Sequence, residues 1–416
     1  MIASTPPMGW NSWDCYGTAV DEKTVRANAD YMARHLKPFG WEYIVVDIQW
    51  SQPTAATHEY EAFAPLTMDA YGRLTPAVNR FPSAAGGAGF KPLADYVHSL
   101  GLKFGIHIMR GIPRQAAHAR LPVAGSQVTC AQLADPNSIC AWNPDMYGVR
   151  QRHPQARAYY DSIFALYASW GVDFIKCDDI AREYPHCKRE IELISEACRA
   201  CGREMVLSLS PGPAPVEQAE HLKQYANMWR ITDDFWDEWR LLKGMFERAE
   251  KWCIHAAPGH WPDADMLPVA ALRQNDNPPG WTRFTRAEQR TMMTLWSMMR
   301  SPLMIGSELT KLDDFTLSLL TNADVLAIGR DSWCGHPLYT TEDAAAWIAP
   351  RRDGRGAWVA LFNLSDEERL LSLRLPDAGV TGTNARELWT DEIVCGDEVS
   401  AALAPHDAAV WLVTEA

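Results

Sequence analysis

The sequence predicts an α/β fold, a (β/α)8 TIM barrel over residues 1–325 followed by a small antiparallel β-sandwich over residues 326–416. Short apolar, strand-like runs alternate with helical patterns through the first three quarters of the chain. After about Arg330 the pattern changes to short alternating strands separated by turns. The length of 416 residues is too great for one small domain and suits a barrel with an added module.

The expected barrel strands lie at 8–10, 43–47, 103–108, 172–177, 204–208, 228–231, the stretch before His260, and 303–306. Helical patterns lie at 22–36, 92–100, 156–170, 188–200, 239–252 and 286–299. The seventh strand has the weakest pattern, because Cys253-Ile254-His255 offers little apolar length. Sandwich strands are expected at 344–350, 356–363, 370–375, 385–389 and 408–413.

Four strand-to-helix stretches, among them 50–90 and 110–147, are longer than plain barrel loops. Long loops on a rigid scaffold usually shape a binding site, so we expect these stretches to border the mouth of the barrel.

Composition excludes several classes of protein. The net charge of -13, without any run rich in Lys or Arg, argues against a nucleic-acid partner. No apolar run of about 18 residues predicts a membrane span. The start of the sequence shows no basic-then-apolar signal pattern, so a cytoplasmic protein is the simplest interpretation.

Ten cysteines are scattered along the chain. Cys198 and Cys201 form a Cys-x-x-Cys pair within a helical pattern, without a second pair or clustered histidines, which favours two ordinary buried thiols over redox or zinc chemistry. Cys130 and Cys140 are candidates for a bridge within one loop.

Two acidic sites follow strand-like runs. Asp178 ends the run 171–177, and Asp233-Asp234 follows the run 228–232. Because strand ends in a parallel barrel converge on one mouth, residues distant in sequence meet there. Two carboxylates across such a mouth are the minimal equipment for cleaving a glycosidic bond. We therefore expect Asp178 and Asp234 to be the catalytic pair.

Asp178 suits the nucleophile. Lys176 lies two residues earlier on the same strand and points to the same face, where its charge would keep the carboxylate ionised. The alternative is that Asp178 or Asp179 caps the following helix, which would explain one of these residues but not both.

Asp234 suits the general acid. Negative charge from Asp233 and Asp237, with desolvation by the aromatic residues that follow Asp234, would raise its pKa and favour proton donation. Arg230 would oppose this, so we expect Arg230 to hold a substrate hydroxyl or to face the nucleophile. The alternative is an acidic N-terminus for the next helix, which the helix dipole favours.

Other residues near the strand ends are candidates for binding a sugar. Asp47 and Asp263 would accept hydroxyl groups and orient the ring. Tryptophans supply flat apolar faces, and we expect two or three at this rim to touch the ligand, with Trp13 and Trp50 as candidates. The tryptophans near the rim are Trp10, Trp13, Trp50, Trp142, Trp236 and Trp261. No set of His or Glu residues shows metal-ligand spacing, so neither metal nor cofactor is expected.

These segments together resemble glycoside hydrolase family 27, the α-galactosidases and their relatives. The similar segments are 7–13 (PMGWNSW), 176–178 (KCD), 229–234 (WR followed by Asp234), 261–267 (WPDADML) and 301–306 (SPLMIG). The match runs in order over nearly the whole chain. The resemblance implies a retaining exo-glycosidase with Asp178 as nucleophile and Asp234 as acid/base.

The sequence departs from the family pattern where the sugar is recognised. Asp47 is followed by Ile48, whereas the family usually has two consecutive Asp. Residues 207–212 (LSLSPG) replace the Cys-Glu-Trp segment that reads the sugar 2-position, which makes Ser208 a candidate contact. Residues 105–110 (GIHIMR) replace a third-strand motif with Tyr and Asp, which makes His107 another.

We therefore expect the chemistry to be retained and the specificity altered. The carbohydrate substrate carries a terminal α-galactoside, or a related α-N-acetylgalactosaminide, β-L-arabinopyranoside or α-glucoside. Small residues at the 2-position would admit an N-acetyl group, and a lost carboxylate would suit a sugar without a hydroxymethyl group.

Two other classes of function compete with a glycosidase. A non-catalytic sugar-binding barrel is disfavoured because a lectin does not need an acid/base pair. A metal-dependent barrel hydrolase would lose activity to a chelator. We expect the C-terminal sandwich to pack on the barrel rather than to bind carbohydrate.

Overall fold

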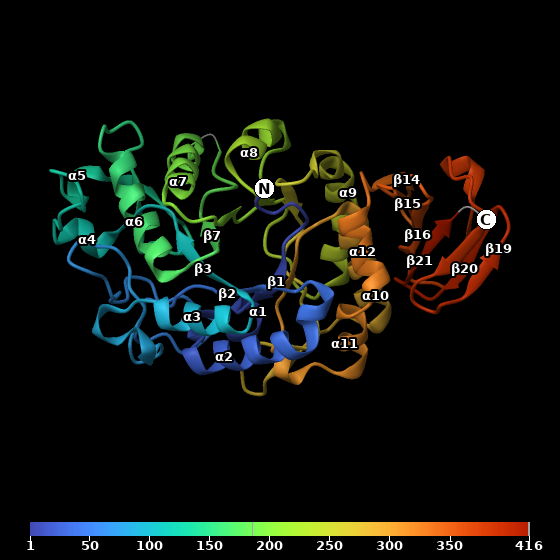
Figure 1. Ribbon diagram of the computed structural model, residues 1–416, viewed down its shortest axis with the longest axis horizontal. Helices are drawn as coiled ribbons and strands as arrows, with labels where there is room; N and C mark the ends of the chain where they lie inside the picture. Colours follow the sequence, from blue (N-terminus) through green and yellow to red (C-terminus); the bar gives the residue numbers. More distant parts are fainter. Residues whose placement is uncertain (185, 415–416) are drawn as a thin grey trace.

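A computed structural model describes residues 1–184 and 186–414 of the chain and contains the predicted barrel (Figure 1). Its sheet has eight parallel strands in the order β10-β9-β8-β7-β3-β2-β1-β13, which follows the chain. The strands are β1 (Met8–Asn11), β2 (Tyr43–Val46), β3 (Lys103–Met109), β7 (Phe174–Asp178), β8 (Val206–Leu209), β9 (Met228–Arg230), β10 (Trp261–Asp263) and β13 (Leu303–Ile305).

The barrel closes through the segment after β10. Leu267 pairs in parallel with Ile305 of β13. The Leu267 N–H donates to the Met304 carbonyl at 2.8 Å, and the Gly306 N–H donates to the Leu267 carbonyl at 3.1 Å. Closure therefore uses a residue beyond the short strand β10, and the predicted (β/α)8 architecture is confirmed.

The predicted position of the seventh strand was wrong. We expected it before His260, but β10 begins at Trp261, and Cys253–His255 forms a 3-10 helix. A strand of three residues, one of them proline, carries too little periodic signal to be located from the sequence.

Helices separate the strands along the chain. They are α2 (Glu22–Tyr31), α3 (Lys91–Ser99), α6 (Ala156–Trp170), α7 (Lys188–Ala200), α8 (Ala219–Tyr225), α9 (Trp239–Trp252), α10 (Arg286–Met299), α11 (Asp314–Leu320) and α12 (Ala323–Asp331). Local sequence sets their ends. Thr285 and Glu288 form a capping box at the start of α10, and α6 ends at Gly171 in the left-handed conformation.

Short elements surround the mouth of the barrel. The helix α1 (Trp13–Tyr16) follows β1, and the hairpin of β11 (Ala271–Leu272) and β12 (Gly280–Trp281) follows β10. The long stretch after β3 folds into a three-stranded sheet with two short helices. These elements are β4 (Ile112–Pro113), α4 (Arg114–His118), α5 (Cys130–Leu133), β5 (Ala134–Ile139) and β6 (Met146–Val149).

The C-terminal domain is a β-sandwich of a six-stranded and a two-stranded antiparallel sheet. The larger sheet holds β14 (His336–Thr340), β15 (Ala344–Pro350), β16 (Ala357–Asn363), β21 (Ala408–Thr414), β18 (Asn384–Glu387) and β19 (Ile393–Cys395); the smaller holds β17 (Arg369–Arg374) and β20 (Glu398–Leu403). The predicted strand set lacked β14, β19 and β20. The predicted boundary after residue 325 falls inside α12.

The sandwich packs against the barrel beside α9, α10 and α12 (Figure 1). Phe362 of β16 meets Phe246 of α9 with ring centroids 5.0 Å apart. Arg290 of α10 forms an ion pair with Asp407 beside β21. The two domains therefore share one continuous apolar core. Among the described residues, no helix has both the length and the apolar character needed to cross a bilayer.

Candidate active site

A cavity of about 280 Å³ opens at the carboxyl ends of the barrel strands. Asp178 and Asp234, the predicted catalytic pair, both line it, together with Lys176, Arg230 and Asp47. The barrel topology thus brings these five predicted side chains into one cavity, on β7 and β9 or after the ends of β2 and β9, and Trp13 of α1 lines it as a sixth.

Asp178 is the last residue of β7 and is buried. Its Oδ2 accepts a hydrogen bond from His107 Nε2 at 2.9 Å, and its Oδ1 accepts one from the Asp179 N–H at 3.0 Å. Burial alone would raise the pKa of Asp178, but His107 and Lys176 together hold that pKa well below its usual range. The carboxylate is therefore ionised and fixed in orientation, as a nucleophile must be.

Neither Asp178 nor Asp179 caps a helix, because the next helix, α7, begins only at Lys188. The capping alternative is thereby removed.

Lys176 and Asp47 form a buried ion pair across the cavity floor. Lys176 Nζ lies 2.8 Å from Asp47 Oδ2, and the Asn11 side chain donates to the same oxygen at 2.7 Å. Burial would raise the pKa of Asp47, but the charges of Lys176 and His107, with the hydrogen bonds from Lys176 and Asn11, together lower it. Burial would lower the pKa of Lys176, but Asp47 and Asp178 raise it. A rigid donor and a rigid acceptor thus stand side by side, an arrangement suited to adjacent sugar hydroxyls.

Arg230 does not face the nucleophile candidate, one of the two positions we expected for it; the other, a contact with a substrate hydroxyl, stays a prediction. Its NH2 group lies 3.2 Å from Asp234 Oδ1 and 2.7 Å from Asp265 Oδ2, so it contacts the acid/base candidate. Burial would lower the pKa of Arg230, but Asp265 and Asp234 raise it. The Asp234 side chain itself is 57% exposed at the mouth, where a leaving group would enter and depart.

Of the residues expected to act on Asp234, only Asp237 lies outside the cavity lining, where Arg273 and Arg283 hold it at 3.1 and 3.0 Å. Phe235 and Trp236 line the cavity, although the Phe235 ring also packs in the apolar core. In the irregular segment between β9 and α9, side-chain direction does not follow any period that the sequence displays.

Asp265 lines the cavity in place of the predicted Asp263. Asp263 lies behind it, where its Oδ1 accepts a hydrogen bond from the Asp265 N–H at 2.9 Å. Burial, together with the negative charges of Asp234 and Asp263, raises the pKa of Asp265 even though Arg230 opposes the shift.

Asp14 is a cavity residue that the sequence did not single out. It lies in α1, is only 3% exposed, and lines the cavity. Its Oδ2 has no hydrogen-bond partner among the described residues. Burial, followed by the negative charge of Asp265, raises its pKa well above the usual range. A signal was available, because Asp14 directly follows the motif that ends at Trp13.

Aromatic side chains form one wall of the cavity. Trp13 stacks on Tyr60 with ring centroids 5.2 Å apart, and Tyr60 meets Trp142 at 5.1 Å. Tyr60 and Trp142 come from the two long loops after β2 and β3, as expected of loops at the mouth. Ile48 is buried behind this wall, in an apolar cluster with Met109 and Met146 against which the three rings pack.

Besides Asp263, three other predicted sugar contacts lie outside the cavity lining. The prediction that Trp50 contacts the sugar was wrong. Trp50 is buried against Phe90 and Trp170, and its Nε1 donates to the His107 carbonyl at 2.7 Å. Ser208 is buried on β8, and the cavity is lined from this side by Pro211 instead. His107 is buried outside the cavity lining and contacts Asp178, the candidate nucleophile.

All ten cysteines are free, so Cys130 and Cys140 are not bridged. Residues 1–184 and 186–414 contain no cluster of three or more His, Cys, Asp or Glu side chains arranged to hold a metal ion.

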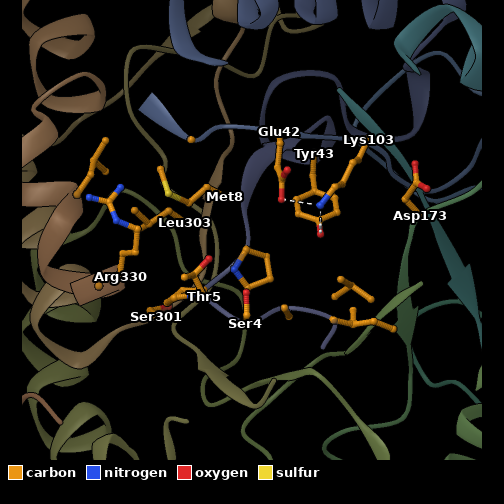
Figure 2. A pocket seen from close by; sticks show the side chains of 18 of the residues that line it. Ser4, Thr5, Met8, Glu42, Tyr43, Lys103, Asp173, Ser301, Leu303 and Arg330 are labelled. Atoms are coloured by element: carbon orange, nitrogen blue, oxygen red, sulfur yellow. Dashed lines mark hydrogen bonds and ion pairs between the residues drawn. The ribbon is translucent and has the colours of Figure 1, made fainter. Parts of the chain in front are cut away.

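A second cavity, of about 340 Å³, lies at the opposite end of the barrel (Figure 2). Figure 2 shows Glu42, Tyr43 and Lys103 together on its lining, and all of these residues precede or begin a strand. Lys103 is paired with Glu42 at 2.9 Å, and Asp173 is paired with His98 at 2.7 Å. Catalytic residues of barrels lie at the other end, so the smaller cavity is the candidate active site.

Comparison with known proteins agrees with this geometry. Residues 5–146 and 145–331 match the family model described as alpha galactosidase A, and residues 341–413 match the alpha galactosidase C-terminal beta sandwich domain. An alpha-galactosidase from Cyamopsis tetragonoloba is 30% identical over 99% of this chain and 87% of its own length. One from Coffea arabica is 31% identical over 99% of this chain and 94% of its own length.

Solved structures extend the likeness. A β-L-arabinopyranosidase of glycoside hydrolase family 27 from Geobacillus stearothermophilus is 53% identical, with a TM-score of 0.97, and the match covers 100% of this chain and 97% of that one. A putative alpha-N-acetylgalactosaminidase from Bacillus halodurans is 51% identical, with a TM-score of 0.90, over 100% of this chain and 99% of that one. This chain therefore belongs to the alpha-galactosidase family, glycoside hydrolase family 27, and is a glycoside hydrolase.

Proposed function

We propose that this glycoside hydrolase releases terminal β-L-arabinopyranose, with retention of configuration, through Asp178 and Asp234. β-L-Arabinopyranose has the ring configuration of α-D-galactopyranose but lacks its hydroxymethyl group. The proposal therefore selects one of the alternatives that the sequence left open.

The observation that carries this choice is the apolar residue next to Asp47. Family members usually have a second carboxylate here, but this chain has Ile48, buried with Met109 and Met146 behind the Trp13 and Tyr60 rings. A buried apolar wall cannot satisfy the hydroxyl of a hydroxymethyl group, and leaving a hydroxyl unpaired costs about 1–3 kcal/mol. The likeness to the Geobacillus stearothermophilus β-L-arabinopyranosidase, also solved in complex with arabinose, supports the same choice.

The proposed reaction proceeds in two displacements. Asp178, held by His107 and the Asp179 N–H, attacks the anomeric carbon while Asp234 donates a proton to the leaving oxygen. Asp234, now ionised, then takes a proton from a water molecule, which releases the sugar from Asp178. A retaining site requires about 5–5.5 Å between the two carboxyl groups.

The remaining cavity residues would hold the sugar. Lys176 and Asp47 are placed to bind adjacent hydroxyls, and Trp13 offers an apolar face. Arg230, fixed between Asp234 and Asp265, would orient the acid/base residue and contact a hydroxyl beside it.

Hydrolysis of four aryl glycosides tests the proposal: β-L-arabinopyranoside, α-galactoside, α-N-acetylgalactosaminide and α-glucoside. We expect the highest kcat/KM for the arabinopyranoside, no turnover by Asp178→Asn, and first release of the β anomer by NMR. Preferred turnover of another glycoside would overturn the choice of sugar, and first release of the α anomer would overturn the retaining mechanism. The location remains a prediction of a cytoplasmic enzyme, which the ten free thiols support.

A further inference from the structure

We propose that Arg110 is a positioning residue that fixes the nucleophile Asp178 through the two peptide units that carry it. This inference rests on the proposed function only in taking Asp178 as the nucleophile. Arg110 lies in the segment 105–110 that departs from the family pattern, and it does not line the active-site cavity.

The first support is the direct contact of Arg110 with the backbone of Asp178 and Asp179. Arg110 follows β3, which pairs with β7 so that Met109 lies opposite Asp178. The Arg110 N–H donates to the Asp178 carbonyl at 3.1 Å, and its Nε donates to the Asp179 carbonyl at 2.6 Å. Its NH2 group also lies 2.9 Å from Asp179 Oδ2. The backbone of residue 110 therefore holds Asp178, and the arginine side chain holds the next residue, Asp179, at the end of the strand β7.

The second support is the backbone conformation of Asp179. Its φ of 59° lies in the left-handed region, which is unfavourable for a residue with a side chain and is usually held in place by surrounding contacts. In this conformation the Asp179 N–H lies 3.0 Å from Asp178 Oδ1. The contacts from Arg110 to the Asp179 carbonyl and carboxylate hold the turn that makes this bond.

The third support is the anchoring of Arg110 from behind. Its NH1 group donates to Ser138 Oγ at 2.9 Å and lies 3.5 Å from Glu190 Oε2. Glu190 is fully buried on α7 and accepts hydrogen bonds from the Val149 N–H and the Tyr160 hydroxyl. The guanidinium is therefore fixed between two carboxylates, and its position does not depend on a mobile surface contact.

Arginine suits this role better than lysine. A planar guanidinium donates in several fixed directions, whereas an ammonium is a single point charge. Lysine at position 110 would keep the charge but could not serve the Asp179 carbonyl, the Asp179 carboxylate and Ser138 together. Arg300 provides a matched control: it is 1% exposed, and its Nε donates to the Gly329 carbonyl at 3.1 Å, but it lies at the junction with the sandwich.

The test compares Arg110→Lys with Arg300→Lys on the aryl glycoside that the wild type cleaves best. Because a misplaced catalytic group costs about 100-fold in rate, we expect kcat of Arg110→Lys to fall 10- to 100-fold with KM changed less than about threefold. Arg300→Lys should keep the wild-type kcat. Covalent labelling with a 2-deoxy-2-fluoro glycoside, measured by the mass of the intact protein, gives the fraction of enzyme molecules with a competent active site. The kcat of each variant is then expressed per labelled site.

The outcomes separate this inference from the proposed function. A normal kcat per site in folded Arg110→Lys, or an equal loss in Arg300→Lys, would overturn the positioning role. Which glycoside the wild type prefers decides the choice of sugar independently, and no turnover of any glycoside by the wild type would overturn both proposals. If Arg110→Lys fails to fold, Asp179→Asn replaces it, since it removes the 2.9 Å ion pair and keeps the backbone groups; an unchanged kcat in Asp179→Asn would likewise contradict the inference.

Discussion

His107 Nε2 lies 2.9 Å from Asp178 Oδ2, and His107 is almost completely buried. His107 and Asp178, the proposed nucleophile, occupy neighbouring strands, β3 and β7, in a register that pairs His107 with Lys176. The Asp178 carboxylate thus receives this hydrogen bond from inside the barrel, on the side away from solvent.

Replacing His107 by Gln should make the enzyme sensitive to acid. Burial raises the pKa of Asp178 and His107 opposes that effect, so a weaker partner allows the pKa to rise. Asp178 must be ionised to attack, and the acid limb of the kcat/KM profile should therefore move to higher pH. A hydrogen bond to a charged group contributes about 1.5–3 kcal/mol. Weakening it should therefore lower kcat/KM by about tenfold or more on the acid limb of the profile. The measurement is kcat/KM from the lowest pH at which the folded enzyme is stable up to pH 8, because the acid limb set by Asp178 lies below the usual carboxyl range.

His98→Gln is the control for this prediction. His98 also contacts an aspartate, Asp173 at 2.7 Å, but at the opposite end of the barrel. The kcat/KM profile of His98→Gln against pH should keep the wild-type acid limb. An unmoved limb in His107→Gln would contradict the role of His107.

Replacing Asp234 by Ala should affect substrates according to their leaving group. A general acid contributes about 10²–10⁴-fold to rate, and a leaving group that needs no proton depends on it least. We expect the loss on an alkyl glycoside to exceed the loss on a dinitrophenyl glycoside, and added azide to accelerate turnover of the latter.

Asp233→Asn provides the matched control. Asp233 lies next to Asp234 and pairs with Arg182 at 2.6 Å, and asparagine keeps an acceptor for the Asp234 N–H, which lies 3.0 Å from Asp233 Oδ1. Asp233→Asn should retain most activity on both substrates. Equal losses on both glycosides in Asp234→Ala, without any response to azide, would show that another residue is the acid/base.

Two tryptophans predicted to bind sugar should behave differently. Trp13→Ala removes part of the cavity wall and should raise KM about tenfold, which corresponds to about 1.4 kcal/mol of binding. Trp50→Phe deprives the His107 carbonyl of a buried donor and should lower the free energy of unfolding by about 1–3 kcal/mol, with KM unchanged. Steady-state kinetics and urea unfolding check both. A raised KM in Trp50→Phe would contradict its placement in the core.

The sandwich should contribute to stability through its contact with the barrel. Phe362→Ala removes a fully buried ring that packs on Phe246 and should lower the free energy of unfolding by about 3–5 kcal/mol. Leu370→Ala, on an exposed part of the same domain, should change it by less than about 0.5 kcal/mol. Urea unfolding of the full-length chain measures both, and equal effects would argue against a packing role for the sandwich.

The fold and the meeting of Asp178, Lys176 and Asp47 in one cavity were within reach of the sequence because they depend on regular elements. Asp178, Lys176 and Asp47 lie on or directly after parallel strands, where alternation fixes the side-chain direction and the barrel fixes the location. The strand β10 could not be located from the sequence, because three residues are too few to show a periodic pattern. The closure of the barrel through Leu267 could not be predicted either, because it uses an irregular segment.

The rest of the site depends on loops and on contacts between distant segments. The direction of Asp263 and Asp265 is set by a backbone that enters the left-handed region at Asp265, which their spacing does not reveal. Tyr60 reaches the cavity from a long loop whose path no periodic pattern encodes. The sequence position of Trp50, just after a strand, predicts a residue at the rim of the barrel. In the structure its ring packs on Phe90 and Trp170 in the core instead.

The most direct test of the central claim is the ratio of kcat/KM for p-nitrophenyl β-L-arabinopyranoside to that for p-nitrophenyl α-D-galactopyranoside, measured for the wild type and for Ile48→Asp. The wild type should prefer the arabinopyranoside by about tenfold or more, because a hydroxymethyl group would meet an apolar wall. Ile48→Asp should shift the ratio toward the galactoside. A wild type that prefers the galactoside, with a ratio unmoved by Ile48→Asp, would contradict the account.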